Sequence, residues 1–303
     1  MAHSTRIHET RFDRAFNAIN TALVLLITFV ILLPLLNVVA CSFSEPGAIT
    51  TNRVFIWPVG LNTTAYERLF KLQDIWMGYA NSLFYAIAGT ALNLLVTVMC
   101  AYPLSCKDMM GHKVFLGIFT FTMFFSGGTI PTYLVVRSCR LINTRWALII
   151  PGAMSVYNMI LARTYFMTSI PAELREAARI DGANEAKVLV RIVLPLSMPI
   201  LAVLAMYYAV GHWNSYMSGL IYLTDKTKYP LQLIIRDYLL SDALLDELTS
   251  GGNVTSEYLA KAMGEREVLK YAIIIVSTLP MLILYPFVQK HFMKGVMVGS
   301  IKG

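Results

Sequence analysis

Six long stretches of this 303-residue sequence contain no charged side chain, and they limit the possible folds more than any other feature. Each stretch is rich in Leu, Ile, Val, Phe and Met. A helix that crosses the hydrocarbon core of a bilayer needs about 20 apolar residues. The shortest stretch reaches that length by extending past Arg163, because an arginine near a helix end extends its side chain to the interface. The stretches are residues 15–44, 75–106, 114–136, 146–162, 192–224 and 271–289.

These stretches predict an all-α integral membrane protein with six transmembrane helices. Helices are favoured over a β-barrel because the apolar runs are continuous and do not alternate with a period of two. A buried helix of a soluble protein explains one such run, but not six in a chain whose mean hydropathy is +0.59. The expected helices are residues 17–41, 77–103, 114–137, 146–167, 197–221 and 270–290.

The first apolar run resembles a signal sequence, but it is longer than the roughly 7–15 residues of a signal core. We therefore expect a retained first span after a polar N-terminal segment, residues 1–16. The transmembrane domain then covers residues 17–292, with long loops at 42–76 and 224–269, and residues 293–303 form a tail.

The four cysteines form no C-x-x-C pair, and three of them lie in or beside expected spans. They are interpreted as small apolar side chains, so neither a disulfide framework nor a metal site is predicted. A net charge of +7 suggests a nucleic-acid partner only for a soluble protein. In this chain we expect no nucleic acid, and basic residues that contact membrane lipid at its surface.

The distribution of Lys and Arg predicts the orientation, because cytoplasmic loops are richer in these residues. With the N-terminus in the cytoplasm, 13 of them lie inside and 12 outside. Long loops carry little weight in this rule, and without the two long loops the counts become 13 and 3. We therefore expect both termini to be cytoplasmic, together with the charged segment between the fourth and fifth spans.

That charged segment is unusual in so apolar a chain, with four acids and four bases between Glu173 and Arg191. Ser169 is expected to cap a helix that begins at Pro171, and Gly182 to end it in a left-handed conformation. Asn184 is expected to cap a second helix that runs to Leu194. Residues 169–194 would then form a helical elbow whose small, charged surface suits docking of a soluble partner; a plain solvated loop is the alternative.

Within this elbow the sequence matches a spaced motif. Glu176-Ala177-Ala178, Asp181-Gly182-Ala183 and Ile192-Val193-Leu194-Pro195 resemble the EAA motif of bacterial ABC importer permeases, with Leu189 where an aromatic residue is usual. Phe125–Tyr133, Trp213-Asn214 and the tail Lys294–Gly303 resemble the carbohydrate-uptake permeases, in the branch for complex oligosaccharides. The chain is similar, over about residues 12–303, to the smaller permease subunit of the maltose importer.

The resemblance implies one permease subunit of a heterodimer in the bacterial cytoplasmic membrane. Its partners would be a second homologous permease, two ATPase subunits that use ATP and Mg, and an extracytoplasmic solute-binding protein. The elbow would be the coupling helix that contacts an ATPase. The chain itself would bind no cofactor and be no enzyme, since it has no G-x-x-x-x-G-K-[ST] and no catalytic motif. The coupling residues would be Glu176, Ala177, Ala178, Asp181, Gly182 and Pro195.

Aromatic and amide side chains in the fourth and fifth spans are candidates for the solute path, because sugars bind to ring faces and planar hydrogen-bonding groups. They are Trp213, Asn214, Tyr208, His212, Tyr216 and Asn158. Interfacial anchoring and interior packing are the alternatives. Gly127, Gly128 and Pro131 break the third span and are equally consistent with a gate or with helix packing.

The solute is predicted to be an oligosaccharide. Arg137, Arg140, Arg145 and Arg163 raise the hypothesis of an acidic, uronate-containing one, with lipid head-group contact as the alternative. The loop 224–269 is expected to contact the binding protein. A non-sugar solute is the nearest alternative function. A secondary transporter is less favoured, because none of the six stretches contains Asp or Glu for ion coupling.

Overall fold

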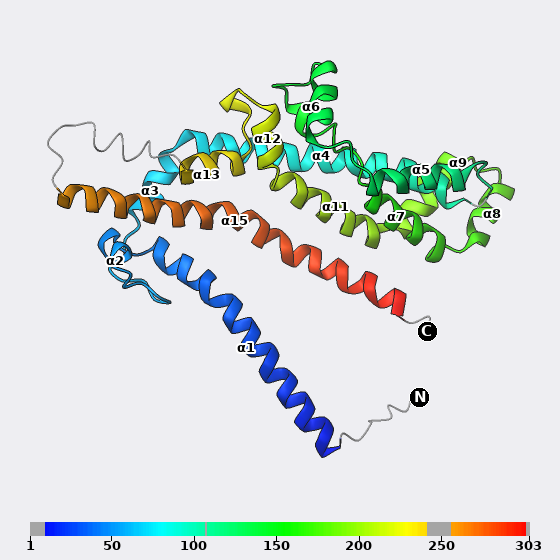
Figure 1. Cartoon of the computed structure of the whole chain (residues 1–303). Helices are drawn as coiled ribbons and strands as arrows, with labels where there is room; N and C mark the ends of the chain where they lie inside the picture. The colour runs from blue at the N-terminus through cyan, green and yellow to red at the C-terminus, as the bar shows by residue number, and fades with distance from the viewer. Residues whose placement is uncertain (1–9, 107, 241–255, 301–303) are drawn as a thin grey trace. The chain divides into compact units, whose positions relative to one another are not determined.

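The computed structural model describes residues 10–106, 108–240 and 256–300, and every regular element in these ranges is helical. The chain divides into two compact units. Unit 1 comprises residues 1–71 and 241–276, and unit 2 comprises residues 72–240 and 277–303. The prediction of an all-α protein is confirmed for the described residues (Figure 1).

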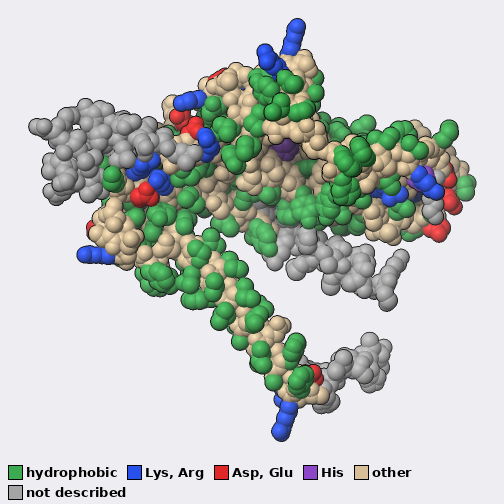
Figure 2. Space-filling view, viewed as in Figure 1, with side chains coloured by type: hydrophobic (Ala, Val, Ile, Leu, Met, Phe, Trp, Pro, Cys, Tyr) green, Lys and Arg blue, Asp and Glu red, His purple; other side chains and the backbone are tan. Residues whose placement is uncertain are grey.

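Unit 1 begins with the long helix α1, Arg11–Ser42. Thr10 and Asp13 form a capping box at its start, in which the Thr10 side chain accepts from the Asp13 N–H. Apolar side chains are exposed along the helix (Figure 2), as expected of a surface that meets lipid. The helix begins six residues earlier than the predicted span, because this capping box lies ahead of the apolar run.

The rest of unit 1 consists of α2, Pro46–Thr50, α3, Thr64–Lys71, and the first part of α15, Ser256–Ser300. The end of α1 packs in a small cluster with α2 and Tyr271. Arg68 on α3 and Glu265 on α15 form an ion pair of 2.7 Å. Residues 256–269 are therefore helical, although the sequence indicates a loop there, and residues 241–255 of that loop lie outside the described residues.

Unit 2 is built around α4, Gln73–Ser105. Helices α7, Val156–Thr168, α11, Met198–Trp213, and α13, Leu231–Leu240, all pack against α4. The main buried cluster lies between α4, α7 and α11 and includes Tyr102, Met159, Phe166, Leu204 and Tyr208. α4 is therefore the central helix of unit 2, against which the other helices pack.

Three predicted spans are interrupted in the structure. The third consists of α5, His112–Phe124, and α6, Thr129–Ser138, which are bent by 115° at the break. The fourth consists of a short 3-10 turn η1, Arg145–Leu148, and α7, separated by a segment that contains Pro151 and Gly152. The fifth ends in α11 and the short helix α12, Tyr216–Tyr222.

The predicted helices at 146–167 and 197–221 are therefore wrong in detail, whereas the interruption of the helix at 114–137 is the one predicted from Gly127, Gly128 and Pro131. Gly128, with a φ of +86°, and Pro151 do not suit a helix interior. Two described helices, α1 and α4, are long and apolar enough to cross a membrane unbroken, and two bent pairs would bring this to four. The six spans stay a prediction.

Candidate functional site: a charged elbow on the end of α4

The elbow consists of α8, Ala172–Ile180, a turn at Asp181–Ala183, and α9, Glu185–Val188, which continues through a π-helical turn η2, Leu189–Val193, into α10, Leu194–Leu196. Two sequence predictions for the turn are confirmed. Gly182 has a φ of +77°, which favours glycine, and the Asn184 side chain accepts from the Lys187 N–H at 2.9 Å. A bend of 83° separates α9–α10 from α11.

The start of the elbow differs from the prediction. Ser169 does not cap α8; it stands at the C-terminal end of α7, where its N–H donates to the Tyr165 carbonyl. Pro171 occupies the cap position of α8 without a side-chain hydrogen bond. The first turn of α8 therefore has no side-chain cap, and Glu173 is the acidic residue there.

The six predicted coupling residues divide between an outer and an inner face of the elbow. Glu176, Ala177, Asp181 and Gly182 are exposed, as is Pro195, whereas Ala178 packs against the main cluster of unit 2. Ile180, beside them, is 86% exposed. A charged, alanine-rich face with an exposed isoleucine is therefore available to a partner. The sequence predicts this face, but not the exposure of Ile180.

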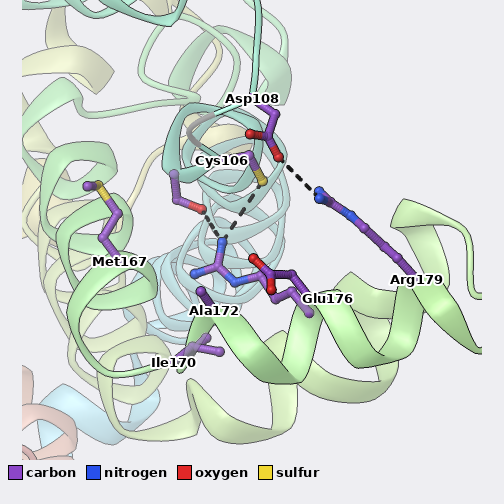
Figure 3. Close-up of a pocket in the computed structure, with 9 residues that line it drawn as sticks. Cys106, Asp108, Met167, Ile170, Ala172, Glu176 and Arg179 are labelled. Carbon is purple, nitrogen blue, oxygen red and sulfur yellow. Dashed lines mark hydrogen bonds and ion pairs between the residues drawn. The ribbon is translucent and has the colours of Figure 1, made fainter.

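Glu176 also lines a cavity of about 220 Å³ between α8 and the end of α4 (Figure 3). Its walls carry two acids, Glu176 and Asp108, and two bases, Arg175 and Arg179. The cavity, at the junction of the elbow and α4, is therefore lined by both negative and positive side chains.

Two arginines join helix ends in this region: Arg175 links the elbow to α7 and α4, and Arg163 links α7 to α4. Arg175 donates to the Phe166 carbonyl near the end of α7 and, at 3.4 Å, to Ser105 Oγ at the end of α4. Arg163 Nε donates to the Leu104 carbonyl at 2.8 Å. Both cations meet C-terminal helix ends, where the unpaired carbonyls and the helix dipole favour positive charge. Arg163 thus belongs to this end of α4, so it does not join the other three arginines of the acidic-solute hypothesis.

Glu185 links three segments of the elbow region. One carboxylate oxygen accepts from the Tyr102 hydroxyl of α4 at 2.6 Å, and the other accepts from Arg179 Nε of α8 at 2.8 Å. The Tyr102 hydrogen bond and the Arg179 guanidinium hold the pKa of Glu185 below its ordinary value. Arg179 also pairs with Asp108 at 3.2 Å, as Figure 3 shows. We call Tyr102, Asp108, Arg179 and Glu185 the elbow clamp.

Sequence reasoning missed Arg175, Glu185 and Tyr102. The six-residue separation of Arg179 and Glu185 across a glycine turn is a weak signal for an ion pair between two short helices. Tyr102 lies more than 80 positions away at the end of an apolar span, and only the fold brings it to the elbow.

Four of the six predicted solute-path residues are buried. Tyr208 and Thr97 share a hydrogen bond of 2.6 Å, and the Ser155 N–H donates to the Tyr208 oxygen at 3.2 Å. His212 Nε2 lies 3.2 Å from Asn93 Oδ1. These bonds hold α11 against α4 and the segment before α7, and Asn158 is buried on α7.

The break between α11 and α12 leaves the other two path candidates accessible. Asn214 and Tyr216 are exposed there. Trp213 is only 3% exposed, its ring lies 6.0 Å from that of Tyr79, and its Nε1 has no hydrogen-bond partner among the described residues. This break therefore combines accessible amide and phenol groups with an unpaired indole N–H.

The gate candidates stand at the break between α5 and α6. Gly127 and Gly128 form the linker, and Pro131 is the third residue of α6, where the first helical turn accepts proline. The break itself is confirmed. All three residues are exposed, and Phe121 and Phe125 stack beside them at 4.4 Å. A gating role stays a prediction.

Comparison with known proteins settles the family. The model of the binding-protein-dependent transport system inner membrane component matches residues 1–298. The chain belongs to this family. It is 38% identical over 303 residues to Protein LplC of Bacillus subtilis, covering 100% of both chains. It is 35% identical over 292 residues, 96% of this chain and 99% of the relative, to the B. subtilis polygalacturonan/rhamnogalacturonan transport system permease protein YtcP.

A solved structure is also similar. A chain in the crystal structure of a bacterial ABC transporter involved in the import of the acidic polysaccharide alginate matches with a TM-score of 0.83 and 34% identity. The match covers 94% of this chain and 99% of that one. The resemblance to carbohydrate ABC importer permeases is therefore confirmed. Such permeases are membrane subunits that work with a second permease, with separate ATPase subunits and with a solute-binding protein.

In this permease, the end of unit 2 opposite the elbow is basic. Arg137 lies in the last turn of α6, Arg140 in the turn that follows and Arg145 at the start of η1, and Lys226 and Lys228 lie between α12 and α13. Asn143 joins the two segments: its N–H donates to the Tyr222 carbonyl at 2.8 Å, and Lys228 Nζ donates to its carbonyl at 2.9 Å. We call these five basic residues the basic edge. Figure 2 shows Lys and Arg side chains beyond the tip of α6.

Asp225 is the one acid in these two segments. Hydrogen bonds from Thr227 and Lys228 lower its pKa to about 2, and Lys228 pairs with it at 3.0 Å. The negative charge of Asp225 is therefore balanced by Lys228, and it does not offset the positive charges of the three arginines.

Proposed function

We propose that this permease is one of two homologous subunits that move an acidic, uronate-containing oligosaccharide across the bacterial cytoplasmic membrane. Two ATPase subunits would supply the energy, and an extracytoplasmic binding protein would deliver the solute. The observation that carries the solute class is the pair of matches over nearly the whole chain: YtcP is named for polygalacturonan and rhamnogalacturonan, and the structural neighbour for alginate. Both names refer to acidic polysaccharides.

The charge distribution supports the same assignment. The basic edge lies near the start of α4, because Asn81 in that helix donates to the carbonyls of Thr227 and Tyr229. The elbow lies at the other end of α4, about 35 Å away for a helix of 1.5 Å rise per residue. With the elbow in the cytoplasm, the basic edge faces the side from which an anionic solute arrives, and its potential attracts that solute.

The topology follows from the same orientation. The chain would cross the membrane six times with both termini and the elbow, residues 169–194, in the cytoplasm. The exposed face of the elbow, with Glu176, Ala177 and Gly182, would enter an ATPase subunit. Closure of the ATPases on ATP and Mg would then move the elbow and the attached end of α4 between two states.

The solute path would pass the break between α11 and α12. Asn214 and Tyr216 are exposed there, so they would supply a ring face and hydrogen bonds to a sugar. Trp213 is buried, and its unpaired N–H would reach a sugar only when the break opens. Tyr208, His212 and Asn158 would act indirectly, by holding α11 and α7 in position. Gly127, Gly128 and Pro131 would allow α6 to swing as a gate.

The test is ATP hydrolysis by the reconstituted importer, stimulated by its binding protein, with a panel of acidic and neutral oligosaccharides. We expect oligouronides to stimulate hydrolysis and neutral oligosaccharides of the same length to stimulate it little. Stimulation by neutral sugars alone would refute the acidic solute while keeping the importer. No stimulation by any sugar would favour the second candidate, an importer of a non-sugar solute.

A further inference from the structure

Arg145 differs from the other arginines of the basic edge in being held in one position. Its Nη2 donates to Asn81 Oδ1 at 3.0 Å. Asn81 is only 3% exposed, and its amide nitrogen donates to the carbonyls of Thr227 and Tyr229 at 2.8 and 3.1 Å. The orientation of the Asn81 amide is therefore fixed, and its oxygen is fixed toward the guanidinium.

An aromatic ring supports the same guanidinium. The Arg145 carbon Cζ lies 5.3 Å from the centre of the Phe84 ring, within the range of a cation–π contact. In the described part of the chain, the Arg137 and Arg140 side chains have no hydrogen bond, ion pair or ring contact of this kind. Arg145 therefore loses less side-chain entropy on binding a ligand than its neighbours do.

Arg145 also keeps binding capacity. The residue is exposed and forms no ion pair with any described residue, and the acid of the neighbouring segment, Asp225, is paired with Lys228. A guanidinium carries five N–H donors in a planar fork, so donors remain after the bond to Asn81. This fork matches a carboxylate, which can accept two parallel hydrogen bonds.

An exposed indole follows Arg145 in the chain. Trp146, the next residue in η1, is 50% exposed. An indole face packs against the apolar C–H face of a sugar, while the carboxylate of a uronate projects from the edge of the same ring. Adjacent positions in η1 thus carry the two kinds of exposed side chain, a guanidinium and an indole, that one uronate residue needs.

We propose that Arg145, positioned by Asn81 and Phe84, binds a carboxylate of the incoming oligosaccharide, with Trp146 against its ring. This inference rests on the proposed function and adds the residue that selects for the acidic group. An anion at this place has a second source, the phosphate of a lipid head group, and the experiment separates the two.

The experiment uses the complete importer with its binding protein, reconstituted in vesicles, and measures transport of an oligogalacturonide with the loaded binding protein at saturation. Arg145→Gln keeps a polar side chain but removes the charge and the fork, and we expect transport to fall about tenfold or more, as for loss of a charge-assisted bidentate contact. Arg145→Lys keeps the charge without the fork, and its transport rate should lie between those of Arg145→Gln and the wild type.

Arg137→Gln is the matched control, because it removes the same charge from an arginine without such support; it should keep at least half of the wild-type rate. Wild-type transport by Arg145→Gln, or an equal loss in Arg137→Gln, would overturn the proposal. Each variant is compared in phosphatidylcholine vesicles and in vesicles that also contain phosphatidylglycerol. A loss confined to the anionic vesicles would assign Arg145 to lipid and overturn the proposal too. A wild-type importer that rejects oligogalacturonide would instead refute the proposed function itself.

Discussion

At the scale of single residues, the charges at the two ends of unit 2 are held in different ways. On the basic edge, Asp225 is tied to Thr227 and Lys228 within one short loop. At the other end, Glu185 and Arg175 join segments that are far apart in the sequence. Local ties of the first kind can be predicted from spacing. The second kind depends on the fold.

Asp225 gives a prediction for the dependence of stability on pH. Its pKa is about 2 in the folded protein, below the ordinary value of 3.8, so the carboxylate stabilises the fold above about pH 4. This contribution is lost as the pH falls from about 4 towards 2. We expect Asp225→Asn to lower the thermal midpoint of the purified complex at pH 6, and the difference from the wild type to shrink on acidification through that window. A difference that grows on acidification would contradict the assignment.

The sequence identifies the elbow turn residue by residue, because capping and left-handed glycine are local effects. Gly182 and Asn184 both behave as predicted. Ser169 does not, because α7 runs to Thr168 and makes Ser169 its own last cap. Arg175 carries no recognisable local signal, because its partners belong to α4 and α7, and Glu185 carries only the weak signal of its spacing from Arg179.

At the scale of helices, the elbow clamp should transmit movement from α8 and α9 to α4. Removing one clamp bond should leave the complex assembled but weaken the link between ATP hydrolysis and transport. We expect Glu185→Gln and Tyr102→Phe each to lower the number of solutes moved per ATP by about twofold to fivefold, as for a bond worth about 0.5–1 kcal/mol. The double variant should lose less than the product of the two, because both changes remove the same bond.

The measurement for the clamp is the ratio of transport to ATP hydrolysis in vesicles. Lys187→Gln is the control, because Lys187 is exposed on α9 and forms no ion pair with any described residue. A purely structural role would lower the amount of complex and leave this ratio unchanged, which would contradict the transmitting role.

The packing of α4 against α11 gives a second prediction at this scale. A methyl group added at Gly89 would lie 2.3–2.6 Å from three atoms of the His212 ring. That ring is held by Asn93, so we expect Gly89→Ala to destabilise the protein by about 1–3 kcal/mol. Gly211→Ala is the control in the facing helix, since a methyl there meets nothing within 4 Å. It should be neutral or stabilising by up to about 1 kcal/mol. Thermal unfolding of the purified complex checks both, and equal midpoints would contradict the packing.

The apolar stretches predict where helices occur, but not where they break. A gap between charges shows only that a segment avoids charge. The break at Gly128 could be predicted from Gly127, Gly128 and Pro131, whereas the break between Trp213 and Tyr216 has no such signal. The Pro151-Gly152 pair is a signal for the end of a helix, but the apolar stretch around it is long enough to predict one continuous span. The helical start of α15 at Ser256 is missed for the opposite reason, because its charged residues resemble a loop.

At the scale of the whole molecule, the family could be predicted from the sequence because the EAA spacing and three further motifs belong to a resemblance that covers nearly the whole chain. The solute path could not. It depends on which faces of the helices meet the second permease, and buried Tyr208 and His212 resemble path residues in the sequence while they bond to α4 in the structure. The sequence also cannot show that Arg145 and Arg163 lie far apart. In the structure they form hydrogen bonds near opposite ends of α4.

The most direct test of the account is uptake of a labelled acidic oligosaccharide into vesicles that contain this permease with its partner subunits. We expect accumulation only when ATP, the ATPase subunits and the loaded binding protein are all present, and no effect of a proton or sodium gradient. Accumulation driven by an ion gradient in the absence of the ATPase subunits would identify a secondary transporter and contradict the account.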